Sequence, residues 1–379
     1  MPTPPSSSID ALRQAILRDT ALQRELAAES TLEPFLDRCA DAAVRLSLSI
    51  GREAIAASLE PSAHSPVLLP PPAPLAAVPP RGWLPGELLV VAGQPVVEWL
   101  HFGDATLSEP FYAQSIARAR ALPINRLMRF GTPAVALAEL PTGPDLDGFV
   151  FHMSRCGSTL VSQMLAALPR AISISEAPAI DGIARLTLAG RLPRETIRGL
   201  IGMLTGSGNA THRFVKFTSW QTILIPLLRE LFPQTPWVFL YRDPVEVLVS
   251  QLRMPSPELL SGIAPSEAIE GMATARAMAM LIGRFAEAAL AAFPAGGGIV
   301  VDYRDLPAAV ETAILPHFGI APDDEARQRM ALAATLDVKR AGQHFMPDSA
   351  LKQDEASIAL REVAEEYINP AFRRLQTLG

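Results

Sequence analysis

Residues 149–160 read FVFHMSRCGSTL, and this stretch decides the fold class. The apolar run at its start predicts a buried strand, the small residues after it predict a tight turn, and an amphipathic helix follows. In such a strand–turn–helix unit, backbone N–H groups and the helix dipole converge on the turn, which can then bind an anion. We expect the anion contacts to come from Ser154, Arg155, Cys156, Gly157, Ser158, Thr159 and Leu160.

This turn differs from the Walker A loop, which places a lysine before its final Ser or Thr. The turn contains no lysine, and its cation is Arg155. No acidic strand end that would hold Mg²⁺ is evident beside it. The sequence therefore predicts an anion site that works without a metal.

The rest of the second half alternates strand-type and helical patterns. The strand-type runs are Ala171–Ser175, Phe214–Phe217, Pro236–Tyr241 and Gly298–Val301. The helical patterns are Thr159–Leu168, Thr196–Leu204, Gln221–Phe232, Val245–Leu252 and Ser266–Phe293. Continuously apolar strands between helices indicate a parallel sheet covered on both faces. We predict an α/β three-layer sandwich whose ligand lies outside the carboxyl ends of the strands.

A second anion-binding element follows the strand that ends at Tyr241. Residues 242–250 read RDPVEVLVS, and Pro244 suits the first position of a helix. That helix would return Ser250 toward the strand end, eight residues after Arg242. A guanidinium fork with a hydroxyl is a good receptor for a phosphate monoester.

The segments SRCGSTL (154–160) and YRDPVEVLVS (241–250) together resemble the sulfotransferases that use 3′-phosphoadenosine 5′-phosphosulfate (PAPS). A third segment, VVDYRDLPAAVETAILPHFGI (300–320), is similar to another part of that family, although Arg304 stands where the family often has Glu. The resemblance covers roughly residues 148–375. It implies a P-loop-like sulfotransferase fold and PAPS as cofactor, with no metal. It also implies that the first segment binds the 5′-phosphosulfate and that Arg242 and Ser250 bind the 3′-phosphate.

Three residues are candidates for catalysis. Arg155 offers a cation for the bridging oxygen of the donor, and Lys216, in the strand-type run RFVK, offers one for the transferring group. Glu176 follows a strand beside the turn and could act as general base. The resemblance implies the same role for Glu176, because tyrosylprotein-type sulfotransferases carry a catalytic Glu at the matching place. The histidines His152, His212 and His344 remain alternative bases, with a core position favoured for His152.

The basic residues also show a strong preference for arginine, since only three of the 33 are lysines: Lys216, Lys339 and Lys352. For Lys352, which lies near the C-terminus, a solvated charge is favoured over a contact with the 3′-phosphate.

The first half of the chain has a different character. Residues 1–60 show three short helical patterns, and they weakly resemble the nitrogen-fixation-associated leader-type helical domains of peptide natural-product precursors. A Pro-rich linker is predicted over 61–82, and a lead-in segment of mixed structure over 83–147 contains strand-type runs Glu87–Ala92 and Pro95–Leu100. The sulfotransferase-like α/β domain is predicted over 148–379.

Composition limits the partners. The chain has 379 residues, 49% hydrophobic side chains and a formal net charge of −6, so we expect neither nucleic acid nor anionic membrane as a partner. Two cysteines, no signal peptide and no long uncharged apolar stretch predict a cytoplasmic protein. The predicted function is sulfuryl transfer to a hydroxyl or phenol of a small molecule or peptide. A homodimer is a possible oligomeric state. The alternatives are a P-loop nucleotide kinase or NTPase and a non-catalytic nucleotide-binding module.

Overall fold

The computed structural model describes residues 8–59, 72–79, 82–103, 107, 109–206, 208–256, 274–335 and 348–379. The chain divides into two compact units, which are described here one at a time. The first consists of Met1–Gly143 with Ala177–Gly208, and the second of Pro144–Glu176 with Asn209–Gly379. The segment 177–208 thus groups with the N-terminal half of the chain, which the strand and helix patterns do not reveal.

The first unit begins with four helices, where three were expected. They are α1 (Ser8–Arg18), α2 (Thr20–Ala27), α3 (Leu32–Arg45) and α4 (Arg52–Ala57). The extra break lies at Asp19, whose backbone is extended and whose carboxylate accepts hydrogen bonds from the N–H groups of Ala21 and Leu22. An Asp in this position caps a new helix, so the region predicted as one helix forms two, α1 and α2.

A small sheet follows in the same unit. Its strands are β1 (Ala73–Pro74), β2 (Trp83–Val91), β3 (Gln94–His101) and β4 (Phe130–Pro133), arranged in the order β1-β4-β3-β2. The helices α5 (Tyr112–Ala121) and α6 (Pro123–Leu127) and the 3₁₀ helix η1 (Ala134–Glu139) complete this part. Strands β2 and β3 form an antiparallel pair and confirm the two strand-type runs of the lead-in segment. Of the predicted linker, residues 72–79 and 82 are described, and they contain β1; the rest lies outside the described residues.

Two helices of the inserted segment pack within this unit. Helix α8 (Pro178–Leu188), which the sequence patterns missed, contacts β2, and α9 (Glu195–Thr205) contacts η1. Close approach requires glycine at both contacts. A Cβ on Gly182 would lie 2.8 Å from Leu88 Cδ2, and one on Gly199 would overlap the Leu137 carbonyl oxygen.

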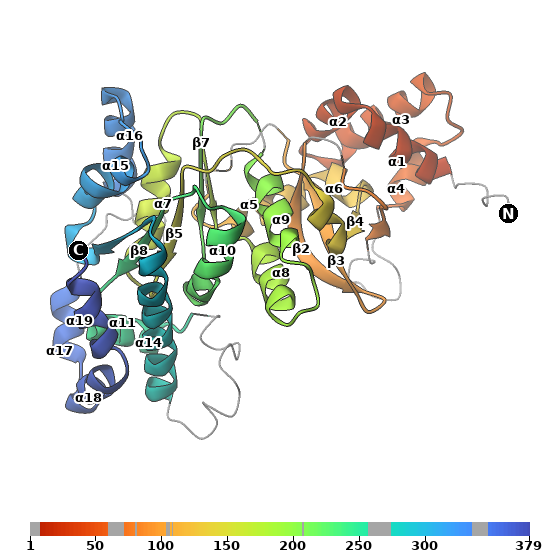
Figure 1. Ribbon diagram of the computed structural model, residues 1–379. Coiled ribbons are helices and arrows are strands. Elements are labelled where there is room, and N and C mark those ends of the chain that lie inside the picture. Colours follow the sequence, from red (N-terminus) through yellow and green to blue (C-terminus); the bar gives the residue numbers. More distant parts are fainter. Residues whose placement is uncertain are drawn as a thin grey trace. The chain divides into compact units, whose positions relative to one another are not determined.

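The second unit is built on a parallel sheet of five described strands (Figure 1). They are β5 (Gly148–His152), β6 (Ala171–Ser175), β7 (His212–Lys216), β8 (Trp237–Tyr241) and β9 (Gly298–Asp302). Their order is β6-β7-β5-β8-β9, with every neighbouring pair parallel. This confirms the predicted strands. It also puts β5 in the middle, between β7 and β8, where the order reverses and ligands of open parallel sheets bind.

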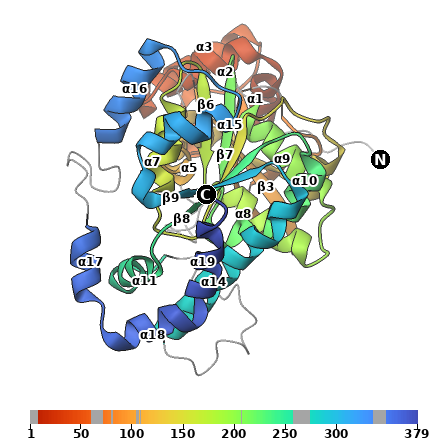
Figure 2. The same cartoon turned by 60° about the vertical axis from the view of Figure 1, so that its left-hand side comes forward.

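Helices cover both faces of this sheet, which confirms the three-layer α/β class (Figure 2). Helix α7 (Ser158–Ala166) lies on one face with α15 (Leu315–His317) and α16 (Asp324–Thr335), and α10 (Ile225–Leu231) and α14 (Thr274–Ala292) lie on the other. The predicted helix over 221–232 is divided into the 3₁₀ helix η2 (Ser219–Leu224) and α10, with Pro226 in the first turn of α10. Proline fits there because the first-turn N–H groups have no helical partner.

Further helices line the C-terminal part of the second unit. They are α11 (Pro244–Arg253), α17 (Ser349–Glu355), α18 (Ile358–Tyr367) and α19 (Asn369–Gln376). The predicted helix over 266–293 corresponds to α14, and its residues 266–273 lie outside the described part. With its 3₁₀ extension to Ala295, α14 is long and apolar enough to cross a membrane by length and composition alone. However, its most apolar window is 56% buried in the protein, and it packs against η2, α18 and α19 as a core helix does.

Candidate active site

Polar and charged side chains gather where the parallel strands of the second unit end. The turn at 153–157 follows β5, Glu176 follows β6, Lys216 ends β7 and Arg242 follows β8. The carboxyl ends of parallel strands meet at one edge of a sheet, so four separate segments contribute to one region.

The turn after β5 has an unusual backbone. Ser154, Arg155 and Gly157 all have positive φ, at 89°, 52° and 80°. Non-glycine residues in this region cost about 1–2 kcal/mol each, so the surrounding structure must hold them there. A Cβ on Gly157 would lie 2.7 Å from Leu306 Cδ1 and 3.1 Å from Tyr303 Cδ2, so the segment after β9 closely covers the turn.

Three hydrogen bonds hold this turn in place. The Ser154 N–H donates to His152 Nδ1 at 3.1 Å, and the fully buried Gln251 amide donates to Ser154 Oγ at 2.6 Å. The Cys156 thiol is buried and lies 3.2 Å from the Leu240 carbonyl oxygen, so Cys156 packs the turn against β8. Successive N–H groups in a turn of this kind, followed by the first turn of α7, form a concave anion receptor.

The remaining predicted contacts of the turn are placed as follows. Ser158 and Thr159 are buried in the first turn of α7, and Leu160 is half-buried beside them. The Arg155 guanidinium donates to the carbonyl oxygen of Met254, which follows the last residue of α11.

Glu176, Lys216 and His152 form a second group. The Lys216 ammonium is 1% exposed and makes a close ion pair with Glu176 Oε1, and His152 Nε2 lies 3.7 Å from the same oxygen. The backbone of Glu176 is also in the left-handed region, at φ 53°. Burial alone would raise the pKa of Glu176, but the Lys216 ammonium and the His152 imidazole outweigh it and hold that pKa well below its ordinary range. The carboxylate is therefore ionised at neutral pH.

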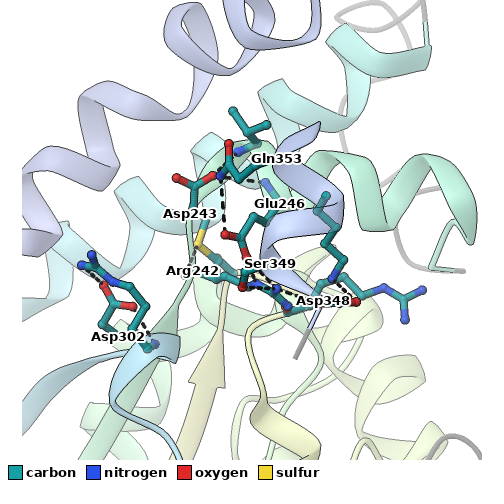
Figure 3. A network of polar contacts seen from close by, with 12 residues as sticks. Arg242, Asp243, Glu246, Asp302, Asp348, Ser349 and Gln353 are labelled. Atoms are coloured by element: carbon teal, nitrogen blue, oxygen red, sulfur yellow. Dashed lines mark hydrogen bonds and ion pairs between the residues drawn. The ribbon is translucent and has the colours of Figure 1, made fainter. Parts of the chain in front are cut away.

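Arg242 is the centre of a third group (Figure 3). Its side chain is 5% exposed and donates to Glu246 Oε2 at 2.6 Å and to Asp348 Oδ1 at 3.0 Å. Its Nη1 lies 3.4 Å from the Arg155 carbonyl oxygen, which links this group to the turn after β5. The guanidinium carbon lies 3.9 Å from the ring centroid of Tyr303, a cation–π distance.

Lys352 belongs to the same group, contrary to the expectation of a solvated charge. Its side chain is 4% exposed and its ammonium lies 2.9 Å from Asp348 Oδ2. Asp348 precedes α17 and Lys352 lies four residues later, in the last turn of that helix, so the two side chains share one helical face and the ion pair compensates for burial of the ammonium. Burial lowers the pKa of Lys352, and Asp348 offsets only part of that effect.

The other predicted residues stand as follows. Ser250 lies six residues into α11, roughly 9 Å along the axis from Pro244, and within the described chain it makes no hydrogen bond to Arg242. Its contact with the 3′-phosphate stays a prediction. His212 stands at the opposite end of β7, where its ring lies 3.2 Å from Asp147, so it is not a base for this site. His344 and Lys339 lie outside the described residues.

The sequence interpretation missed several contributors. Glu246 is four residues after Arg242, a spacing that places it on the same helical face and was a usable signal. Tyr303 lies inside the third family-like segment. No sequence pattern near Gln251 or Asp348 predicts their contacts, because their partners, Ser154 and Arg242, are 97 and 106 residues away in sequence. Within the described residues, no cluster of His, Cys, Asp and Glu has the arrangement of a metal site.

Comparisons with known proteins give structural matches alone. No family model and no curated protein sequence matches the chain. A sulfotransferase from Mycobacterium avium has 14% identity and a TM-score of 0.41, over 67% of this chain and 85% of that one. The sulfotransferase domain of the curacin biosynthetic pathway has 17% identity and a TM-score of 0.41, over 59% and 98%. A sulfotransferase from Alicyclobacillus acidocaldarius has 15% identity and a TM-score of 0.40, over 62% and 96%.

Proposed function

We propose that this chain is a sulfotransferase that moves a sulfuryl group from PAPS to a hydroxyl or phenol acceptor. One observation carries the proposal. A strained turn with several backbone N–H groups, a buried arginine, and a buried lysine paired with the half-buried Glu176 all lie at the carboxyl edge of one parallel sheet, on four different strand ends. Two anion receptors suit a donor with two phosphate-type groups, and the Glu–Lys pair suits transfer chemistry beside them.

The residues present fit the donor. The turn after β5 and the first turn of α7 would hold the 5′-phosphosulfate through backbone N–H groups and the hydroxyls of Ser158 and Thr159. Arg242 and Lys352, which already enclose the Asp348 carboxylate, would hold the 3′-phosphate. PAPS supplies the sulfuryl group, and the protein supplies position and charge.

Each catalytic candidate has a separate task in this proposal. Arg155, at the turn, would neutralise charge on the bridging oxygen, and Lys216 would do so on the transferring group. Glu176 would accept the acceptor's proton. Its lowered pKa keeps it ionised but makes it a weak base, so a phenol, whose ordinary pKa is about 10, would give up its proton more readily than an aliphatic alcohol.

Calorimetric binding of adenosine 3′,5′-bisphosphate, the product of the donor, tests the proposal. Arg242→Ala is expected to abolish binding, because a dianion would lose its bidentate contact. Glu176→Gln is expected to preserve binding and to remove transfer of labelled sulfate to phenol acceptors. Glu362→Gln changes the same charge at an exposed position of α18 and should leave both properties unchanged. No heat of binding in the wild-type protein would refute the proposal.

The alternatives make different predictions. A P-loop kinase or NTPase would bind Mg²⁺-ATP, which the missing lysine of the turn disfavours. A non-catalytic module would bind the nucleotide but transfer sulfate to no acceptor. For the acceptor, the leader-like N-terminal helices motivate a peptide or secondary metabolite. A variant lacking residues 1–82 that used acceptors as the full chain does would contradict a docking role for those helices.

A further inference from the structure

The charges around Arg242 cancel. Arg242 and Lys352 carry two positive charges, and Glu246 and Asp348, which contact them, carry two negative charges. A phosphate monoester brings between about −1.5 and −2 charges at neutral pH. With both carboxylates in place, such a group would gain little from the two cations and would be repelled by their partners. Displacement of one carboxylate would therefore favour phosphate binding.

The two carboxylates are held very differently. Glu246 is 10% exposed, lies within α11, and accepts additional hydrogen bonds from Ser349 and Gln353. Asp348 is 39% exposed, precedes the seven-residue helix α17, and makes no side-chain cap for that helix. The contacts of the Asp348 carboxylate in the described chain are with the two cations, Arg242 and Lys352. Figure 3 shows both carboxylates in the network around Arg242. Of the two, Asp348 is the more exposed and has fewer other contacts, so it is the one that can be exchanged.

We infer that Asp348 is an internal counter-anion, whose carboxylate occupies the place between Arg242 and Lys352 that the 3′-phosphate of the nucleotide takes. The inference rests on the proposed function. A carboxylate and a phosphate both accept paired N–H bonds from a guanidinium, so one replaces the other without loss of hydrogen bonds at Arg242. Before displacement, Asp348 is the ion-pair partner of the buried Lys352 and shares Arg242 with Glu246.

This arrangement also selects among nucleotides. A nucleotide with a phosphate at the 3′ position can displace Asp348 and compensate both cations. A nucleotide without it leaves Asp348 where it is, and forgoes the contacts with Arg242 and Lys352. Asp348 therefore opposes binding of the bisphosphate and is indifferent to the monophosphate.

The test measures calorimetric Kd values for adenosine 3′,5′-bisphosphate and adenosine 5′-monophosphate at an ionic strength of about 0.15 M. Asp348→Asn keeps the shape but removes the charge, and should bind the bisphosphate roughly tenfold more tightly than the wild-type protein. The monophosphate should bind all proteins equally. Asp354→Asn, at an exposed position of the same helix, is the matched control and should match the wild-type protein. Asp348→Ser removes the same charge with a different side chain and should reproduce the shift.

Other results would overturn the inference. Unchanged or weaker bisphosphate binding in Asp348→Asn would mean that the carboxylate orients the cations instead of competing with the ligand. Equal tightening for the monophosphate, or tightening in Asp354→Asn, would indicate a long-range charge effect in place of exchange. In each of these cases the proposed function stands, because the wild-type protein binds the bisphosphate. Absence of bisphosphate binding in every protein would reject both.

Discussion

Lys216 and Glu176 show how a single buried ion pair joins structure to chemistry. Desolvating an ammonium is expensive, and its cost is recovered only when a well-placed opposite charge is present. The Lys216 side chain is 1% exposed, and its ammonium makes an ion pair with Glu176, 40 residues earlier in the chain. The same contact helps to keep Glu176 ionised, so the residue proposed as base is held in its charged form by the residue proposed as electrostatic stabiliser.

A double-mutant cycle measures this dependence. Lys216→Met should lower the free energy of unfolding by about 3 kcal/mol, because it leaves the Glu176 carboxylate without its main partner. The double variant Lys216→Met/Glu176→Gln should lose about 2 kcal/mol less than the two single variants added together, as measured by urea unfolding. The exposed pair Glu325–Arg329 is the control and should show little coupling. Additive losses at 176 and 216 would contradict a coupled pair.

The turn between β5 and α7 is the element on which the site depends. Its shape comes from three residues with positive φ, and two of these are not glycine. Gly157 is the one whose missing side chain matters, because Tyr303 and Leu306 lie where a Cβ would be. The N–H groups that would hold the phosphosulfate are therefore positioned by the left-handed backbone conformation of the turn and by packing against the segment after β9.

Gly157→Ala is expected to weaken binding of adenosine 3′,5′-bisphosphate at least tenfold and to destabilise the protein by roughly 1–2 kcal/mol. Gly319→Ala separates the two effects, because Gly319 also has positive φ, at 71°, but nothing lies within 4 Å of its Cβ position. That control should lose only the stability that its backbone conformation accounts for, less than Gly157→Ala because no neighbour crowds its Cβ, and should keep its affinity. Binding by calorimetry and thermal unfolding give the two readouts, and wild-type affinity in Gly157→Ala would contradict the assigned role of the turn.

The whole chain is divided differently from what a linear pattern indicates. A parallel-sheet domain beginning near residue 148 was expected to contain all the helices that follow. Instead, α8 and α9 belong to the unit formed by the N-terminal half, where their apolar faces pack on β2 and η1. The buried side chains of these faces include Ile180, Ile183, Ile197, Leu200, Ile201 and Leu204.

A fragment covering 148–379 should therefore fold poorly. It keeps α8 and α9 but lacks β2 and η1, so it exposes several side chains whose burial contributes about 1.5–3 kcal/mol each. We expect a lower Tm than that of the full chain, increased binding of the dye ANS, and aggregation in size-exclusion chromatography. A monomeric fragment with the Tm of the full chain would contradict the observed division.

The strands, most helices and the strand–turn–helix unit at β5 could be predicted from the sequence, because periodicity, turn residues and helix caps act over only a few residues. Asp243 and Pro244, for example, start α11 as their types predict. Three features became visible in the folded structure: Arg242 and Lys352 enclose Asp348, Lys216 pairs with Glu176, and α8 and α9 belong to the first unit. These contacts join groups that are distant in sequence, where one neutralises a buried charge or covers an apolar face of the other. The spacing of residues along the chain does not predict such pairings.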